Sequence, residues 1–263
     1  MSTATECIAF VHHKGGTGKT TSCLNIAGWL VRMKKTVLVV DLDPQGNATS
    51  GLGIDRRTID GSIYDVLLGQ KNITEVILET DSGVNLIPSS LDLLVMETHM
   101  AGQIQNTRLL KENLVNVNEH FDYVLIDTPS GSTMLMINGI VACNNMIIQL
   151  DSGIFAYETM ETLRELLIGL NEELGIETNV MMALLKGYSN SIFGWGPSSN
   201  IKKLLKKFLT RNLISSVKIF EIPFSKKIYK AQMKGMPISH YAPYSKVGRA
   251  YKKIAKQIVK KGY

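Results

Sequence analysis

Long hydrophobic runs are absent from this sequence. Apolar stretches such as Val37–Val40 and Met146–Ile148 fall far short of the roughly 18 residues that a membrane-spanning helix needs. The first residues also lack the basic segment and apolar core of a signal peptide, so we expect a cytoplasmic protein without a transmembrane helix.

Cysteine is scarce. The three cysteines, Cys7, Cys23 and Cys143, lie far apart and form no CxxC pair. Their odd number and wide spacing argue against a disulfide framework, a metal site or an iron–sulfur cluster. We expect them to be small core residues.

Acidic residues are nearly missing from the last third of the chain. Between residues 178 and 263 there are 18 Lys and Arg but a single acidic residue, Glu221, whereas residues 1–150 hold 15 Asp and Glu and 10 Lys and Arg. This excess predicts a strongly positive surface. It favours a nucleic acid or an anionic membrane as partner over a merely solvated lysine-rich face.

The chain of 263 residues, with 44% hydrophobic residues, suits one globular domain over residues 1–263. Short apolar runs alternate with amphipathic helical patterns, which predicts an α/β fold with a mainly parallel twisted sheet covered by helices on both faces. Expected strands are Cys7–Val11, Thr36–Asp41, Val84–Pro88, Tyr123–Asp127, Met146–Leu150, Asn179–Leu185 and Val217–Ile222. Expected helices are Lys19–Lys34, Leu109–Asn118, Ala156–Leu174, Asn200–Asn212 and Ser245–Lys261.

A glycine-rich stretch follows the first expected strand and opens the first expected helix, as a P-loop does. Glycines allow backbone N–H groups to converge on phosphate oxygens, and Lys19 would reach the outer phosphates. His13 occupies the first glycine position of the GxxxxGK[ST] pattern, so the strict motif fails by one residue. The expected nucleotide-binding residues here are Lys14, Gly15, Gly16, Thr17, Gly18, Lys19, Thr20 and Thr21.

Three motifs in order carry a family resemblance. The stretch KGGTGKT at 14–20 resembles the deviant Walker A motif of the ParA/MinD group of P-loop ATPases. The stretches DLDPQGN at 41–47 and YVLIDTP at 123–129 resemble its second carboxylate motif and its Walker B strand. The resemblance implies ATP and Mg²⁺ as cofactors, a slow partner-stimulated hydrolysis, and an ATP-dependent homodimer in which Lys14 reaches the partner's nucleotide.

The carboxylates of Asp41, Asp43 and Asp127 are expected to have different roles. Mg²⁺ bound to a triphosphate needs a hydroxyl from the P-loop and a nearby carboxylate, which Thr20 and Asp127 supply. Asp43 lies beyond the second expected strand, where it could position the attacking water, and the resemblance assigns hydrolysis to this aspartate. Asp41 is either a strand-end carboxylate bonded to the backbone or a catalytic group, and the sequence leaves both open.

Within the group, GNATSGLGI at 46–54 and the run from Ile222 to Lys246 resemble the chromosome-partitioning, Soj-like ParA branch. The resemblance places Ile222 and Pro223 against the nucleotide base, although Phe224 and Ser225 replace the usual Arg-Asn. From the sequence alone, the pair is equally consistent with a strand end before a turn. Ser130 and the segment 149–153 also depart from the family pattern. GTP is disfavoured because no T/NKxD motif occurs.

The resemblance also implies non-specific DNA binding, a ParB-like or cargo adaptor protein as partner, and association with the nucleoid. The alternative is a MinD-like ATPase at a membrane surface, less favoured because no aromatic or leucine cluster overhangs the last helix. A small-molecule kinase or synthetase would need a second substrate pocket, for which the sequence offers no candidate. The expected DNA contacts are Lys202, Lys203, Lys206, Lys207, Lys226, Lys227 and Arg249.

Overall fold

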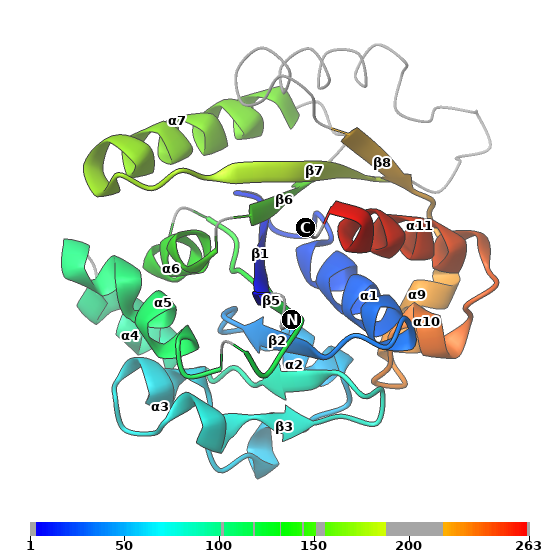
Figure 1. Ribbon diagram of the computed structural model, residues 1–263, viewed down its shortest axis with the longest axis horizontal. Coiled ribbons are helices and arrows are strands. Elements are labelled where there is room, and N and C mark those ends of the chain that lie inside the picture. The colour runs from blue at the N-terminus through cyan, green and yellow to red at the C-terminus, as the bar shows by residue number, and fades with distance from the viewer. Residues whose placement is uncertain are drawn as a thin grey trace.

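The computed structural model describes residues 4–100, 103–117, 119–131, 133–143, 145–150, 156–187 and 218–261. A twisted sheet with strand order β3-β4-β2-β5-β1-β6-β7-β8 runs through its centre (Figure 1). Every neighbouring pair is parallel except β3 and β4. The strands are β1 (Glu6–Val11), β2 (Val37–Asp41), β3 (Leu78–Glu79), β4 (Asn85–Ile87), β5 (Tyr123–Asp127), β6 (Asn145–Leu150), β7 (Asn179–Lys186) and β8 (Lys218–Ile222).

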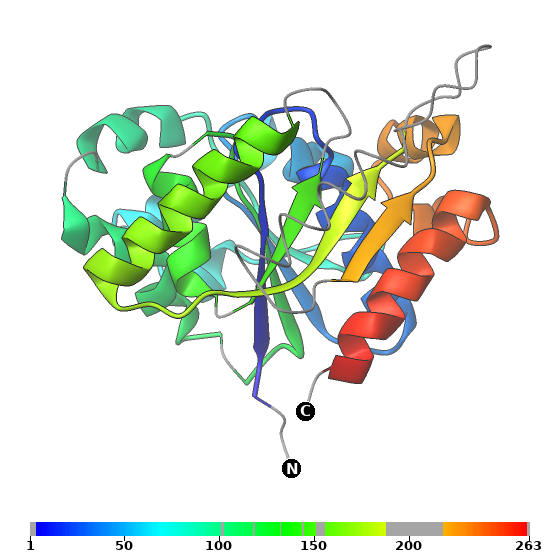
Figure 2. The same cartoon turned by 90° about the horizontal axis from the view of Figure 1, so that it is seen from above.

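Helices cover both faces of the sheet (Figures 1 and 2), which confirms the expected fold class. In β1, Ile8 and Phe10 join the apolar layer on the α1 and α11 side, while Ala9 and Val11 join the layer on the α6 and α7 side. The α-helices are α1 (Lys19–Arg32), α2 (Asn47–Gly51), α3 (Ile63–Leu67), α4 (Leu93–Met100), α5 (Leu109–Leu114), α6 (Met134–Ala142), α7 (Ala156–Leu174), α9 (Lys226–Gln232), α10 (Ile238–Tyr241) and α11 (Lys246–Lys261). Short 3₁₀ helices are η1 (Arg56–Thr58), η2 (Ile73–Val76) and η3 (Ile104–Arg108).

All seven expected strands are present, with ends within one residue of those expected. Strand β3 was not expected, because two residues at a sheet edge leave no alternating pattern. Helix α6 was missed because it is apolar on almost every side, which hides a helical period. The expected helix Asn200–Asn212 lies outside the described residues.

The basic helix α11 packs against α1 through one apolar stripe. Val247, Tyr251, Ile254 and Ile258 are each at most 1% exposed, as the spacing of these residues predicts. The ammonium of Lys252 lies 5.1 Å from the ring centroid of Trp29 on α1, which adds a cation–π contact. The apolar side of α11 is therefore buried within the fold.

No helix in the described part of the chain has both the length and the hydrophobicity that crossing a membrane requires.

The expectation of three unpaired cysteines is right for Cys23, which is free and buried, and wrong for the other two. Cys7 and Cys143 form a disulfide between β1 and the end of α6. Their separation of 136 residues hides the pairing in the sequence, because only the adjacency of β1 and β6 brings the two residues together.

Close packing of α1 on α10 provides a test of this arrangement. A Cβ at Gly28 would lie 2.5 Å from both the Pro237 Cβ and the Ser239 Oγ. We expect Gly28→Ala to lower the free energy of unfolding by about 1–3 kcal/mol, measured by urea denaturation, because the added methyl overpacks this contact.

Gly169→Ala in α7 is the matched control. Outside its own helix backbone, no described heavy atom lies within 4 Å of a Cβ at that position. This change should raise the free energy of unfolding by about 0.5–1 kcal/mol, because alanine has less freedom than glycine to lose in a helix. Equal stability of the two variants would contradict the close contact of α1 with α10.

Candidate phosphate-binding site

The loop between β1 and α1 has the backbone of an anion cradle. Gly16 and Gly18 adopt positive φ angles of 74° and 104°, which side-chain-bearing residues rarely adopt. Gly18 is the N-cap of α1 and provides no side-chain hydrogen bond. The first N–H groups of α1 are consequently left for a ligand at the positive end of the helix dipole.

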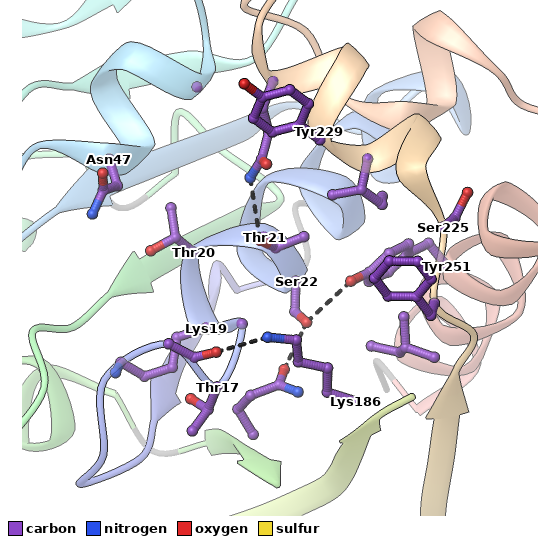
Figure 3. A pocket seen from close by; sticks show the side chains of 18 of the residues that line it. Thr17, Lys19, Thr20, Thr21, Ser22, Asn47, Lys186, Ser225, Tyr229 and Tyr251 are labelled. Atoms are coloured by element: carbon purple, nitrogen blue, oxygen red, sulfur yellow. Dashed lines mark hydrogen bonds between the residues drawn. The ribbon is translucent and has the colours of Figure 1, made fainter. Parts of the chain in front are cut away.

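A cavity of about 850 Å³ opens beside this loop at the carboxyl edge of the sheet. This size lies in the range of small-molecule and cofactor sites. Figure 3 shows side chains from α1, β7, α9 and α11 around it. One end is lined by the loop residues Gly15 to Thr21 with Asp43 and Ser130, and the other by Ile222 to Lys226, residues of α9, and Tyr251.

Lys19 lies at the inner end of the loop. Its side chain is buried, and its ammonium donates to the backbone oxygen of His12 at 3.3 Å. Burial lowers the pKa of Lys19, while the carboxylates of Asp127 and Asp43 oppose that shift. Lys14, in contrast, is exposed at the start of the loop, and the described cavity lining does not include it.

Asp127 has a buried carboxylate with open coordination. It ends β5, opposite Phe10 of β1 and Asp41 of β2. Neither carboxylate oxygen has a hydrogen-bond partner among the described residues. Burial raises the pKa of Asp127, as does Asp41, whereas the Thr20 hydroxyl and Lys19 lower it. A buried carboxylate with so little hydrogen bonding, beside a threonine hydroxyl, is an expected ligand of a hard cation, so Asp127 and Thr20 fit Mg²⁺.

Asp41 is fully hydrogen-bonded within the fold. One carboxylate oxygen accepts from the backbone N–H and the hydroxyl of Thr49, both at 2.7 Å, and the other accepts from the N–H of Asp43 at 3.2 Å. Burial raises the pKa of Asp41 to about 6. Of the two roles left open by the sequence, these contacts favour the strand-end carboxylate that holds the following loop.

The loop carrying Asp43 is held from several sides. Ser89, just after β4, donates its hydroxyl to the Asp43 carbonyl at 2.6 Å, and Arg56 donates to the Pro44 carbonyl at 2.9 Å. The Asp43 carboxylate accepts the N–H of Gln45 at 2.9 Å. Neither Ser89 nor Arg56 was predicted. Ser89 could have been found from its place at the end of a parallel strand, but no signal marks Arg56.

The opposite end of the cavity is formed where β7 and β8 meet. The N–H of Gly187 donates to the Ile222 carbonyl at 2.7 Å. A Cβ at Gly187 would lie only 2.7 Å from that oxygen and 3.1 Å from the Phe224 nitrogen. Glycine therefore lets the segment after β8 close against β7. Ile222 and Pro223 line the cavity there, as does the half-exposed Phe224.

A buried polar network lies beneath the cavity. Ser22 of α1 donates to the side-chain oxygen of Gln149 at 2.6 Å, and its hydroxyl also lies 3.3 Å from that of Tyr251 (Figure 3). Gln149 in turn donates to the Leu184 carbonyl at 3.0 Å. These bonds join α1, β6, β7 and α11 under the site, and sequence reasoning did not find them because their members lie far apart in the chain.

The expected DNA contacts are only partly placed. Lys202, Lys203, Lys206 and Lys207 lie outside the described residues. Lys226 and Lys227 are exposed at the start of α9, and Arg249 is exposed on α11. Lys226 also lines the cavity, so its position suits a ligand there as well as a surface contact.

Comparisons with known proteins agree with this architecture. A family model described as "AAA domain" matches residues 5–180. The sporulation initiation inhibitor protein Soj of Bacillus subtilis is 31% identical and aligns over 98% of this chain and 99% of its own. The chromosome-partitioning ATPase Soj of Treponema pallidum is 32% identical, with 97% of each chain covered.

Among solved structures, one of cobyrinic acid a,c-diamide synthase from Mycobacterium smegmatis, with bound ATP analog and magnesium, matches with a TM-score of 0.82. It is 25% identical, and the match covers 97% of this chain and 94% of that one. The resemblance therefore extends over the described sheet and helices together with the glycine-rich loop.

The buried carboxylate of Asp127 provides a test. We expect Asp127→Asn to raise the free energy of unfolding without metal by roughly 1 kcal/mol, because the change removes a buried charge close to Asp41. The same variant should lose the stabilisation that added Mg²⁺ and nucleotide give the wild type. Urea denaturation with EDTA or with Mg²⁺ and ADP measures both effects.

Asp81→Asn, in the turn between β3 and β4, is the control with the same charge change. Asp81 is exposed, so its replacement should alter the free energy of unfolding by less than about 0.5 kcal/mol in either condition. An Asp127→Asn protein that still gains stability from Mg²⁺ and nucleotide as the wild type does would contradict the assigned cation site.

Proposed function

We propose that this chain, which belongs to the Soj-like branch of the ParA/MinD family of ATPases, binds Mg-ATP at the carboxyl edge of its sheet and hydrolyses it. The observation that carries the proposal is the buried Asp127 carboxylate, which accepts no close hydrogen bond within the described part of the chain and lies near Thr20 and the buried Lys19 of the glycine-rich loop. An ATP analog or ADP with magnesium in similar solved structures supports this choice of ligand.

Each part of the cavity has a task in this proposal. The backbone of Gly15 to Thr21 cradles the phosphates and Lys19 binds the outer ones. Thr20 and Asp127 hold Mg²⁺, which when bound neutralises phosphate charge. Asp43, on its clamped loop, orients the attacking water. Ile222 and Pro223 support the base.

The position of Lys14 suggests a homodimer on ATP binding. Its side chain is exposed at the loop start, outside the described lining of its own cavity. In a face-to-face dimer each Lys14 neutralises charge on the partner's nucleotide. Hydrolysis is slow until a partner protein, ParB-like or a cargo adaptor, stimulates it.

As the surface to which the ATP-bound protein binds, the fold favours DNA over a membrane. The apolar stripe of α11 is buried against α1, so this helix has no free apolar face to insert into lipid. Its remaining side chains include exposed cations such as Arg249, Lys253 and Lys256, which suit phosphate contacts. The ATP-bound dimer coats nucleoid DNA without sequence preference and releases it after hydrolysis, so that a bound cargo is segregated or positioned.

The nucleotide site is tested by two substitutions with different outcomes. We expect Lys19→Ala to weaken ATP binding by about 100-fold, because it removes a charge-assisted contact to phosphate. Asp43→Ala should bind ATP within about threefold of wild type yet turn over about 100-fold more slowly, because it loses the group that orients water. Calorimetry and phosphate release measure the two effects, with Asp81→Ala as the control. Unchanged ATP affinity in Lys19→Ala would refute the assignment.

DNA binding is tested by charge reversal. We expect simultaneous Glu substitutions at Lys202, Lys203, Lys206 and Lys207 to abolish ATP-dependent DNA binding and to leave ATP binding intact. Wild-type affinity should fall steeply with salt, because counterions are released on binding. Filter binding across salt concentrations checks this, and Lys14→Ala should lose the ATP dependence. A wild type that ignores DNA at low salt but pellets with anionic liposomes would instead support the MinD-like alternative.

A further inference from the structure

A third lysine reaches the glycine-rich loop from a distant strand. Lys186, the last residue of β7, donates its ammonium to the Gly16 carbonyl at 2.8 Å (Figure 3). It lines the cavity at the phosphate end, next to Gly18 and Gln149. We infer that Lys186 is a positioning residue of the phosphate site, which holds the Gly16–Thr17 peptide in one orientation and so fixes the shape of the loop that binds the phosphates. The inference rests on the proposed function.

The geometry of the peptide bond supplies the reason. In a planar trans peptide the C=O and the next N–H point in opposite directions. An ammonium that holds the Gly16 carbonyl therefore also fixes the direction of the Thr17 N–H. Gly16 has a positive φ of 74°, and a glycine loop without an anchor samples many such orientations. The hydrogen bond from Lys186 to Gly16 therefore reduces the conformational entropy that the loop would otherwise lose when a ligand binds.

Lys19 and Lys186 each hold a different backbone carbonyl of the loop. Lys19 donates to the carbonyl of His12 and Lys186 to that of Gly16. With these two carbonyls held by ammonium groups, the loop offers N–H donors and positive charge to an anion. The arrangement matches what a phosphate cradle needs.

Lys186 also joins the two ends of the cavity. It stands opposite Ile222 in the register of β7 and β8, and the next residue, Gly187, bonds to the Ile222 carbonyl. The same strand end thus anchors the phosphate loop on one side and the Ile222–Phe224 wall on the other. None of the three sequence motifs includes this residue.

Binding measurements on Lys186→Met test this role of Lys186, because methionine keeps much of the apolar side chain and removes the hydrogen-bond donor. We expect the variant to bind ADP and inorganic tripolyphosphate about tenfold more weakly than wild type, as loss of a hydrogen bond from a charged group predicts. Lys186→Arg should restore affinity to within about threefold. The control is Lys218→Met, which removes an exposed charge at the start of β8 and should bind both ligands as wild type does.

A readout without ligand separates positioning from general stability. Hydrogen exchange of the amides in residues 13–19 should quicken about tenfold in ligand-free Lys186→Met. Its thermal midpoint should stay within about 2 °C of that of Lys218→Met, since neither residue is buried in the core.

Three results would overturn the inference: unchanged tripolyphosphate affinity in Lys186→Met, an equal loss in Lys218→Met, or unchanged exchange in the loop. If the first of these results came with weaker ADP binding, the lysine would serve the nucleoside alone. If the wild type binds neither ligand, the proposed function is refuted as well. If the wild type binds both ligands with the same affinity as Lys186→Met, only the positioning role of Lys186 is refuted.

Discussion

The buried carboxylate of Asp127 is the group on which the rest of the site depends. A carboxylate at the end of a central strand, unpartnered among the described residues, is costly unless a cation or a donor completes it. Burial raises the pKa of Asp127 and the negative charges of Asp41 and Asp43 raise it further, whereas the Thr20 hydroxyl and Lys19 lower it. The site is therefore balanced for a ligand that brings its own cation, as a Mg-nucleotide does.

Holding these charges in place is the work of the surrounding fold. Two apolar layers pack the faces of the sheet, so that strand ends converge at one rigid edge. Hydrogen bonds then fix each loop that leaves this edge. Thr49 and Ser89 hold the loop after β2 through Asp41 and the Asp43 carbonyl, and Lys186 holds the loop after β1. Rigid placement of charged groups before the ligand arrives is what lowers the cost of binding and catalysis.

The basic C-terminal third contributes residues both to the cavity and to the positive surface. Tyr251 of α11 contributes to the polar network beneath the cavity, while the outward cations of the same helix remain exposed. Lys226 likewise belongs both to the cavity lining and to the positive surface. In the proposed function, nucleotide and DNA therefore meet on the same elements. This offers a direct physical route for the nucleotide state to affect DNA affinity.

Local sequence was enough to determine the parallel strands, the glycine-rich loop and the carboxylates at strand ends, because period, turn chemistry and strand-end position all act over a few residues. It also predicted the buried stripe of α11 from its spacing. What it missed depends mainly on residues far apart in the chain. The pairing of Cys7 with Cys143 and the hydrogen bond from Lys186 to Gly16 form only because the sheet order places β1 beside β6 and β6 beside β7. The bonds that favour a structural role for Asp41 are shorter in range, to Asp43 and Thr49, but they depend on how the chain folds back after β2. No local pattern records such contacts, so the tertiary structure alone decided them.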